Sequence, residues 1–186
     1  MAKVKQAPSI FADTEPLWHY VKGTGQWINV VDVDEYGKWS VNLYGDEVLA
    51  LETELQAYLD EAVAFAKEQG KDVKAIADLY KEYDGKRYIQ FKKPQYDEDT
   101  EGPKLYNVHG DEVTGTFKKP IGGGSTVRVR AMIKPYYMAS TKTVGLTYKL
   151  LAMQIIENKE YKGASGFEDE SGGAEKAPFE TEAEDY

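Results

Sequence analysis

The order of apolar and polar residues predicts strands at both ends of the chain and helices between them. Aromatic and β-branched residues alternate with polar ones in two early stretches, which is the period of a half-buried strand. The first strand is expected to begin at Trp18 and to end at Gly23 and Gly25. The second is expected over residues 39–44.

Apolar residues then recur at steps of three and four, which is the period of a helix with one buried face. They predict a long helix from about Asp46 to just before Gly70. Its apolar members are Val48, Leu51, Leu55, Tyr58, Leu59, Ala62, Phe65 and Ala66. A second, shorter helix is expected from Asp72 to about Asp84, with the same spacing at Val73, Ile76, Ala77 and Tyr80.

Strand patterns return in the second half of the chain. A strand over 86–94, a weaker one over 105–108 and two long ones over 125–137 and 144–157 are expected. The first long strand has the clearest alternation: Val127, Val129, Ala131 and Ile133 share one face, and Arg128, Arg130, Met132 and Lys134 share the other. About five strands with an inserted long and short helix predict a mainly β protein, a small Greek-key barrel.

Composition narrows the class of protein. A chain of 186 residues with 41% hydrophobic residues can bury the core of one domain. The absence of cysteine excludes disulfides, thiolate catalysis and thiolate metal sites, and two distant histidines (His19 and His109) make a metal enzyme unexpected. Neither a signal peptide nor an apolar run of membrane-spanning length is visible, so a cytosolic protein is expected.

The net charge of −9 is divided unevenly along the chain. Residues 164–186 hold eight acidic residues and one lysine, a net charge of −7, and residues 46–84 also carry −7. Residues 86–149 carry +6. The protein therefore combines a basic β segment with an acidic helical segment and an acidic tail, and its low overall pI does not argue against nucleic acid.

The basic strand is the first candidate for chemistry. Arg128, Arg130 and Lys134 on one face, with Lys92 and Lys149 on possible neighbouring strands, can follow a phosphate backbone. The same charges can also do no more than keep the exposed face of a strand soluble. Tyrosines in the same segment favour nucleic acid, because bases stack on aromatic rings beside cations; they are Tyr88, Tyr136, Tyr137 and Tyr148.

Other patterns do not point to chemistry. The glycine run over 121–125 lacks the lysine and the spacing of a phosphate-binding loop, so we interpret it as a loop that leads into a strand. The acidic stretch that begins at Asp32 has Tyr36 and Leu43 where a calcium loop needs ligands. No catalytic constellation is present, and the acidic cluster at 97–99 is expected to be a solvated loop.

The acidic tail is the second candidate. Residues 163–186 are too poor in apolar residues to fold alone, and they end on an aromatic residue, Tyr186, after Glu184 and Asp185. The tail can be a solubilising end. It can also occupy a basic, aromatic groove in place of DNA, or bind partner proteins.

Taken in order, these features resemble a known family. The residues concerned are the run 121–125, the basic alternation after it, Pro135-Tyr136, Val144-Gly145 and the acidic tail. Together they resemble the replication single-stranded DNA-binding proteins of the T-odd short-tailed bacteriophages. The resemblance extends to Glu15-Pro16 before an aromatic strand, to the long helix, and to Asp84-Gly85 before the strand with Phe91 and Lys92.

The resemblance implies an OB-fold domain over residues 1–163 followed by a disordered tail over 164–186. It implies sequence-tolerant binding of single-stranded DNA in phage replication and recombination, and promotion of strand annealing, in the bacterial cytoplasm and without catalysis or a cofactor. In that family the tail contacts the phage DNA polymerase and the helicase–primase, competes with DNA and helps to form a homodimer.

The resemblance also assigns residues. Its DNA contacts match Arg128, Arg130, Lys92, Tyr136 and Lys3, and Tyr137 can replace a family tryptophan that is Met138 here. The strand pattern adds Lys134 and Tyr88 to the predicted DNA-binding set. The predicted partner-binding tail residues are Glu182, Glu184, Asp185 and Tyr186, where the family ends on phenylalanine.

One alternative stays open at this point. An OB-type barrel can serve as a protein-interaction or scaffolding module that binds no nucleic acid. That function would require the acidic helical segment 46–84 to fold over the basic segment and neutralise it.

Overall fold

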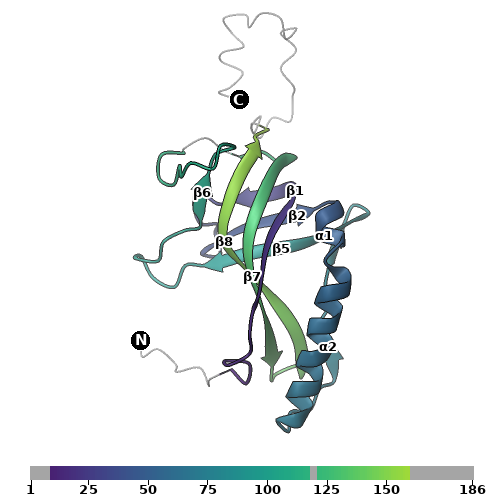
Figure 1. The fold of residues 1–186 in the computed structure, drawn as a ribbon. Helices are drawn as coiled ribbons and strands as arrows, with labels where there is room; N and C mark the ends of the chain where they lie inside the picture. Colours follow the sequence, from purple (N-terminus) through teal and green to yellow (C-terminus); the bar gives the residue numbers. More distant parts are fainter. Residues whose placement is uncertain (1–8, 118–120, 160–186) are drawn as a thin grey trace, which may run out of the picture.

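The computed structural model of the chain describes residues 9–117 and 121–159 (Figure 1). Its strands are β1 (Leu17–Asn29), β2 (Lys38–Tyr44), β3 (Ala75–Ile76), β4 (Lys81–Tyr83), β5 (Lys86–Pro94), β6 (Lys104–Tyr106), β7 (Ser125–Met138) and β8 (Thr143–Glu157). Its helices are α1 (Asp46–Leu49) and α2 (Glu52–Glu68). These bounds confirm five of the expected strands, with each end within two residues of its predicted position. The five are the strands expected over 39–44, 86–94, 105–108, 125–137 and 144–157.

Five of the strands form a closed ring. β8, β7, β1, β2 and β5 are neighbours in that order, each antiparallel to the next. The ring closes where β5 meets β8 in parallel, at Lys92 and Lys149. A five-stranded Greek-key barrel of this kind is the OB-fold, so the predicted fold class is confirmed.

The alternation in β7 builds the barrel core as predicted. Val127, Val129, Ala131 and Ile133 are fully buried, whereas Arg128, Arg130, Met132 and Lys134 are on the outer face. The inward residues of β2 and β5, among them Val41, Leu43 and Phe91, complete the same core. Strand parity therefore fixes which side chains the barrel presents to solvent.

The prediction that β1 ends at Gly23 and Gly25 is wrong, because the strand continues to Asn29. These glycines lie where β1 passes from β7 to β2. A Cβ atom on Gly23 would lie 2.6 Å from the carbonyl oxygen of Tyr44, and one on Gly25 would lie 2.7 Å from Cδ1 of Ile28. Glycine here lets two parts of the barrel approach closely and does not mark a turn.

The long helix is present as α1 and α2, separated by a turn at Ala50 and Leu51. The apolar stripe of α2 is buried at Leu55, Leu59, Ala62 and Ala66, and Gly70 follows with a positive φ of 78°. Figure 1 shows α2 beside the ends of β7 and β8 that extend below the barrel. In the described residues, no helix is long and apolar enough to cross a membrane.

The second predicted helix, from Asp72 to about Asp84, is wrong. The segment contains β3 and β4 instead, because two strand edges take its backbone hydrogen bonds. The amides of Lys74 and Ala77 donate to carbonyl oxygens of the β7–β8 turn and of β8. β4 then forms a hairpin with β5 through Asp84-Gly85, with φ values of 51° and 73°. A two-residue Asp-Gly turn with positive φ at both positions is a strong hairpin signal that outweighed the local helical spacing.

Candidate nucleic-acid interface

Basic and aromatic side chains lie in facing rows on the outer surface of β1 and β7. Lys22 is opposite Arg128, Tyr20 is opposite Arg130, and Trp18 is opposite Met132 in the strand register. Trp18 is 55% exposed and Tyr20 67% exposed. We refer to Trp18, Tyr20, Lys22, Arg128 and Arg130 as the β1–β7 face. It presents aromatic rings and cations side by side, as a flexible polyanion with unstacked aromatic bases requires.

The two arginines are held in place by neighbouring side chains. The Arg130 guanidinium lies 5.8 Å from the centroid of the Tyr20 ring, and Arg128 Nη1 donates to Gln154 Oε1 at 3.3 Å. Both border a hollow of about 260 Å³ that Tyr106 also lines. Within residues 9–117 and 121–159, neither arginine forms an ion pair with a carboxylate. Their charges therefore face the hollow without an acidic partner from the described chain.

Lys134 lies further along the outer face of β7 and has a structural contact. Its Nζ donates to the carbonyl oxygen of Ala12, which precedes β1 in the chain, at 3.0 Å. This contact fixes the segment that precedes β1 against β7. Of the predicted basic residues on β7, Arg128 and Arg130 are thus the two grouped with exposed aromatic rings.

A second group forms where β5 has a free edge. β5 pairs with β4 over 86–88 and with β8 at Lys92, and a cleft of about 980 Å³ opens between these two contacts. Three residues of the predicted DNA-binding set line this cleft: Tyr88 and Lys92 from β5 and Tyr136 from β7. Lys149, named from the sequence as a possible neighbour, is the register partner of Lys92. Two lysines at the same point of the barrel create a local positive field.

The floor of this cleft is built by buried and paired groups. The Tyr148 hydroxyl donates to the carbonyl oxygen of Leu79 at 3.1 Å, and burial raises the pKa of Tyr148. Arg87 forms an ion pair with Glu52 at 3.0 Å and lies over the ring of Tyr80 at 4.4 Å. The Arg87 charge is therefore already used to join the barrel to α2.

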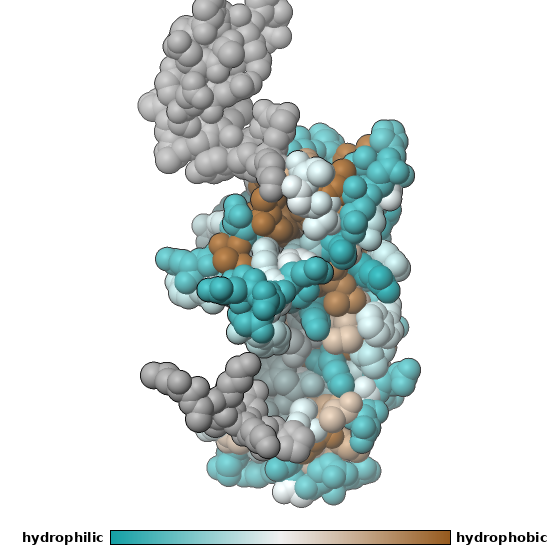
Figure 2. Space-filling model, turned by 90° about the vertical axis from the view of Figure 1, so that its left-hand side faces the viewer, coloured by the Kyte–Doolittle hydropathy of each residue, from teal (hydrophilic) through white to brown (hydrophobic). Residues whose placement is uncertain are grey.

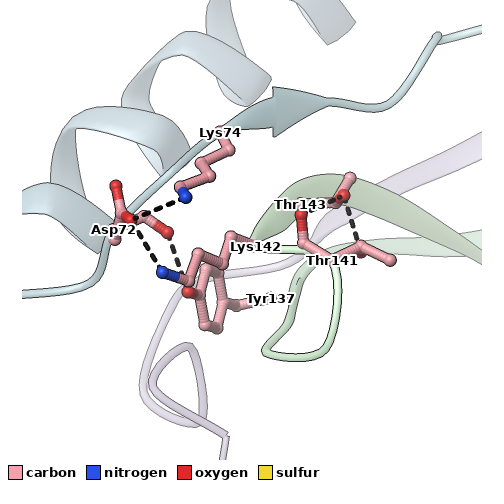
Figure 3. Close-up of polar contacts among 6 residues, drawn as sticks. All are labelled: Asp72, Lys74, Tyr137, Thr141, Lys142 and Thr143. Atoms are coloured by element: carbon pink, nitrogen blue, oxygen red, sulfur yellow. Dashed lines mark hydrogen bonds and ion pairs between the residues drawn. The ribbon is translucent and has the colours of Figure 1, made fainter.

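Tyr137 is separated from the other predicted residues. Because it follows Tyr136 directly, it points to the opposite face of β7. There it packs against a second buried cluster, which we call the α2 cluster: Phe11, Leu59, Ala62, Ala66 and Val144. Its hydroxyl donates to the carbonyl oxygen of Asp72 at 2.8 Å. Figure 3 shows this contact beside the ion pair between Lys142 and Asp72, at 2.9 Å, which raises the pKa of Lys142. The arrangement gives Tyr137 a structural position and leaves Tyr136 at the cleft.

Trp18 and Tyr20 are interface candidates that sequence reasoning did not assign. The alternation of Trp18, Tyr20 and Lys22 already placed the three on one face of a strand. What the sequence lacked was the register that sets them opposite Met132, Arg130 and Arg128.

Of the remaining predictions, those for the glycine run and the acidic cluster can be compared with the structure, and those for the two ends of the chain cannot. The glycine run leads into β7 as expected, with the Ser125 hydroxyl donating to the carbonyl oxygen of Gly122 at 2.6 Å. The acidic cluster is an exposed turn in which Asp97 accepts from Thr100. The predicted residues Lys3, Glu182, Glu184, Asp185 and Tyr186 lie outside the described residues. In the described ranges no three acidic or histidine side chains are grouped for a metal ion.

The surface around these sites is mixed. Figure 2 shows hydrophobic side chains in separate patches among hydrophilic ones on the face that it presents. The exposed large apolar residues include Trp18, Tyr20 and Trp27 on β1 of the barrel and Tyr83 on β4. These aromatic residues lie in small groups beside charged residues, which differs from the large continuous apolar patch of a protein-docking surface.

The barrel and its outer face define a protein of the OB-fold class, a fold whose strand faces bind oligonucleotides and oligosaccharides in many proteins. Among solved structures, the chain is similar to the crystal structure of gp2.5, a single-stranded DNA-binding protein encoded by bacteriophage T7. The TM-score is 0.64 and the identity 17%, over 84% of this chain and 97% of that chain.

A second solved structure is the C-terminal truncation of the single-stranded DNA-binding protein from bacteriophage Enc34. It has a TM-score of 0.50 and 15% identity, over 77% of this chain and 87% of that chain. No protein-family model and no curated protein sequence matches the chain. The resemblance to the T-odd phage proteins is therefore confirmed at the level of the fold.

Proposed function

We propose that the protein binds single-stranded DNA on the outer face of its barrel, without catalysis and without marked sequence preference. The observation that carries the proposal is the β1–β7 face, where arginines without acidic partners in the described chain lie beside exposed aromatic rings. Phosphates would contact Arg128, Arg130 and Lys92, and bases would stack on Tyr20, Trp18 and Tyr136. The T7 and Enc34 proteins of similar fold are named as single-stranded DNA-binding proteins, which supports the proposal.

A protein-interaction module without nucleic acid is the less favoured function. That function would require the acidic helical segment 46–84 to cover the basic strands and neutralise their charge. In the described residues, Glu52 pairs with Arg87, Glu54 with His19, and Asp72 with Lys74 and Lys142. The Asp72–Lys74 contact lies within the helical segment, and the other three join that segment to His19, Arg87 and Lys142; none of these ion pairs in the described residues involves Arg128 or Arg130.

A fluorescence titration tests DNA binding. Oligo-dT is expected to quench the tryptophans, more strongly at low than at high salt, and a duplex of equal length is expected to have a weak effect. The reason is that stacking needs unpaired bases and phosphate contacts release counterions. The absence of salt-sensitive quenching by oligo-dT at low salt would contradict the proposal.

The biological role that we propose follows the resemblance. The protein would coat single strands during phage DNA replication and recombination in the bacterial cytoplasm and would promote annealing. It would act as a homodimer, and its acidic tail would bind the phage DNA polymerase and helicase–primase. This part is supported by the sequence resemblance and by the tail's net charge of −7.

The tail is expected to compete with DNA. A chain that ends at Gly163 loses a net charge of −7 and is expected to bind oligo-dT more tightly than the full chain at low salt. The same titration of both chains measures this effect. Equal affinities would leave the tail as a partner-binding or solubilising segment only.

Lys92 gives a pH-dependent prediction. Desolvation of the Lys92 ammonium group, together with the nearby Lys38 and Lys81, lowers the pKa of Lys92 from its ordinary value. A lowered pKa means that the positive charge is lost earlier as the pH rises. As the pH rises toward the ordinary lysine pKa of about 10.4, the wild type is therefore expected to lose affinity for oligo-dT earlier than Lys92→Arg, because arginine stays charged. Parallel pH profiles for the two proteins would remove Lys92 from the interface.

A further inference from the structure

A small pocket on the outer face of β2 and β5 has no role in the function proposed so far. Its volume is about 230 Å³, and Asn42, Tyr44, Trp27, Tyr83, Asp84 and Lys86 are among its lining residues. β2 and β5 are the second and third strands of the barrel in chain order. In OB-folds, the face of these two strands binds oligonucleotides.

Asn42 carries the argument. Its side chain is only 6% exposed, and its Oδ1 atom has no hydrogen-bond partner among the described residues. Its register partners are Gln26 on β1 and Gln90 on β5, so it lies in the middle of a row of carboxamides across three strands. A buried polar group without a partner destabilises a fold and is rare in native proteins. A residue of this kind that lines a pocket is the pattern expected when a ligand completes the hydrogen bonding.

The mouth of the pocket is aromatic. Trp27 and Tyr83 are 51% and 60% exposed and pack edge to face, with ring centroids 4.8 Å apart. The register shift between Gln26 and Asn29 places Trp27 there with a positive φ of 44°. Bulky residues rarely adopt this conformation, and irregularities of this kind often redirect a side chain toward a site.

A cation lies at the rim. The Lys86 Nζ atom is 4.5 Å from the centroid of the Tyr44 ring and 3.4 Å from its hydroxyl oxygen. The pocket thus offers flat apolar walls, a carboxamide that needs a partner, and an ammonium group that shares the lining with the Asp84 carboxylate. This set matches one nucleobase, which has a flat ring to pack against the aromatic side chains and a polar edge to bond with the carboxamide.

We infer that this pocket holds one unpaired nucleobase by its Watson–Crick edge, through the Asn42 carboxamide between the Trp27–Tyr83 pair and Tyr44. The inference rests on the proposed function and deepens it. All four DNA bases have an N–H donor on that edge, so the pocket accepts any of them. In a duplex the same edge is paired and unavailable. The Asn42 pocket therefore selects single strands over duplexes without selecting a sequence.

The test compares two oligonucleotides of equal length, oligo-dT and an oligomer of N3-methylthymidine. They have the same backbone charge and similar rings, but the methyl group removes the N–H donor. The full-length wild type is expected to bind the methylated oligomer roughly 3- to 10-fold more weakly, the range for loss of one hydrogen bond at a buried acceptor. The discriminating quantity is the ratio of the two dissociation constants.

Asn42→Leu removes the carboxamide with little change in volume, and its ratio is expected to fall to about one. Ser40→Ala is the matched control: Ser40 is also buried on the outer face of β2 but does not line the pocket, so the wild-type ratio is expected. If Asn42→Leu does not fold, Trp27→Leu at the exposed mouth takes its place, again with a ratio near one.

The outcomes separate the two proposals. Equal binding of both oligomers by the wild type would overturn the pocket and leave single-stranded DNA binding intact. A ratio that persists in Asn42→Leu would also overturn it, because the base edge would then be recognised elsewhere. Failure of the wild type to bind oligo-dT at all would overturn the proposed function and the pocket together.

Discussion

Replacement of Arg128 and Arg130 together by alanine is expected to weaken the binding of single-stranded DNA by roughly 20-fold at about 0.1 M salt. Each arginine that neutralises a phosphate on a single strand contributes ~0.7 to the slope of log affinity against log salt. The double variant should therefore lose about 1.4 from this slope. The loss should be equal for all base sequences, because phosphates carry no sequence information.

A matched control removes the same amount of charge elsewhere. Lys74→Ala with Lys142→Ala also removes two positive charges, but both lysines lie beside Asp72, away from the barrel face, at 4.0 and 2.9 Å. This pair is expected to keep the wild-type slope. If the arginine variant kept the wild-type slope, β7 would not be the DNA-binding strand.

Gly23→Ala is expected to destabilise the fold by about 1–3 kcal/mol, the usual range for overpacking. The new Cβ atom would lie 2.6 Å from the backbone oxygen of Tyr44 and 2.9 Å from Cγ of Leu43, which is fully buried. A backbone oxygen in a barrel strand cannot move without disturbing its neighbours. Urea unfolding of the variant and the wild type measures the difference.

Gly25→Ala is the matched comparison on the same strand. Its Cβ atom meets the end of the Ile28 side chain, at 2.7 Å from Cδ1, and a side chain can change rotamer. We therefore expect a clearly smaller loss of stability than for Gly23→Ala. Equal losses for the two variants would show that close approach to Tyr44 does not explain the glycine at position 23.

The sequence predicted the elements whose pattern is local. Buried residues recur every second position in β7 and at steps of three and four in α2, because each element buries one face. Both elements were therefore predictable residue by residue. The segment after Asp72 was not, because its spacing suited a helix whereas the edge of β8 and the turn at Asp84-Gly85 determined its structure. The prediction that the first strand ends at Gly23 was wrong for a similar reason. Glycine is needed there because two strands approach closely, and the local sequence pattern does not contain that information.

The candidate interface was predictable in part. The outward position of Arg128 and Arg130 followed from alternation alone. Their grouping with Tyr20 depends on the register between β1 and β7, which the sequence does not contain. Tyr136 and Tyr137 are adjacent and must face opposite ways, so the sequence left both open and the packing of Tyr137 against the α2 cluster separated them.

The pocket around Asn42 was beyond sequence reasoning altogether. A shift in register places Trp27, a two-residue turn places Tyr83, and three strands bring the carboxamides together. In the described residues, the side chains that line it come from β1, β2, β4, β5 and the turn between β4 and β5. Such a site exists only after the barrel has closed.

The central claim, that single-stranded DNA follows the outer face of the barrel, is tested most directly by mapping its path. An oligonucleotide with 5-iodouracil at successive positions would be photo-crosslinked to the full-length protein, and the modified residues identified by mass spectrometry. We predict crosslinks to aromatic residues on the outer face of the barrel, the exposed Trp18, Tyr20 and Trp27 and the half-buried Tyr136. Crosslinks confined to α2 or to the segment that precedes β1 would contradict the account.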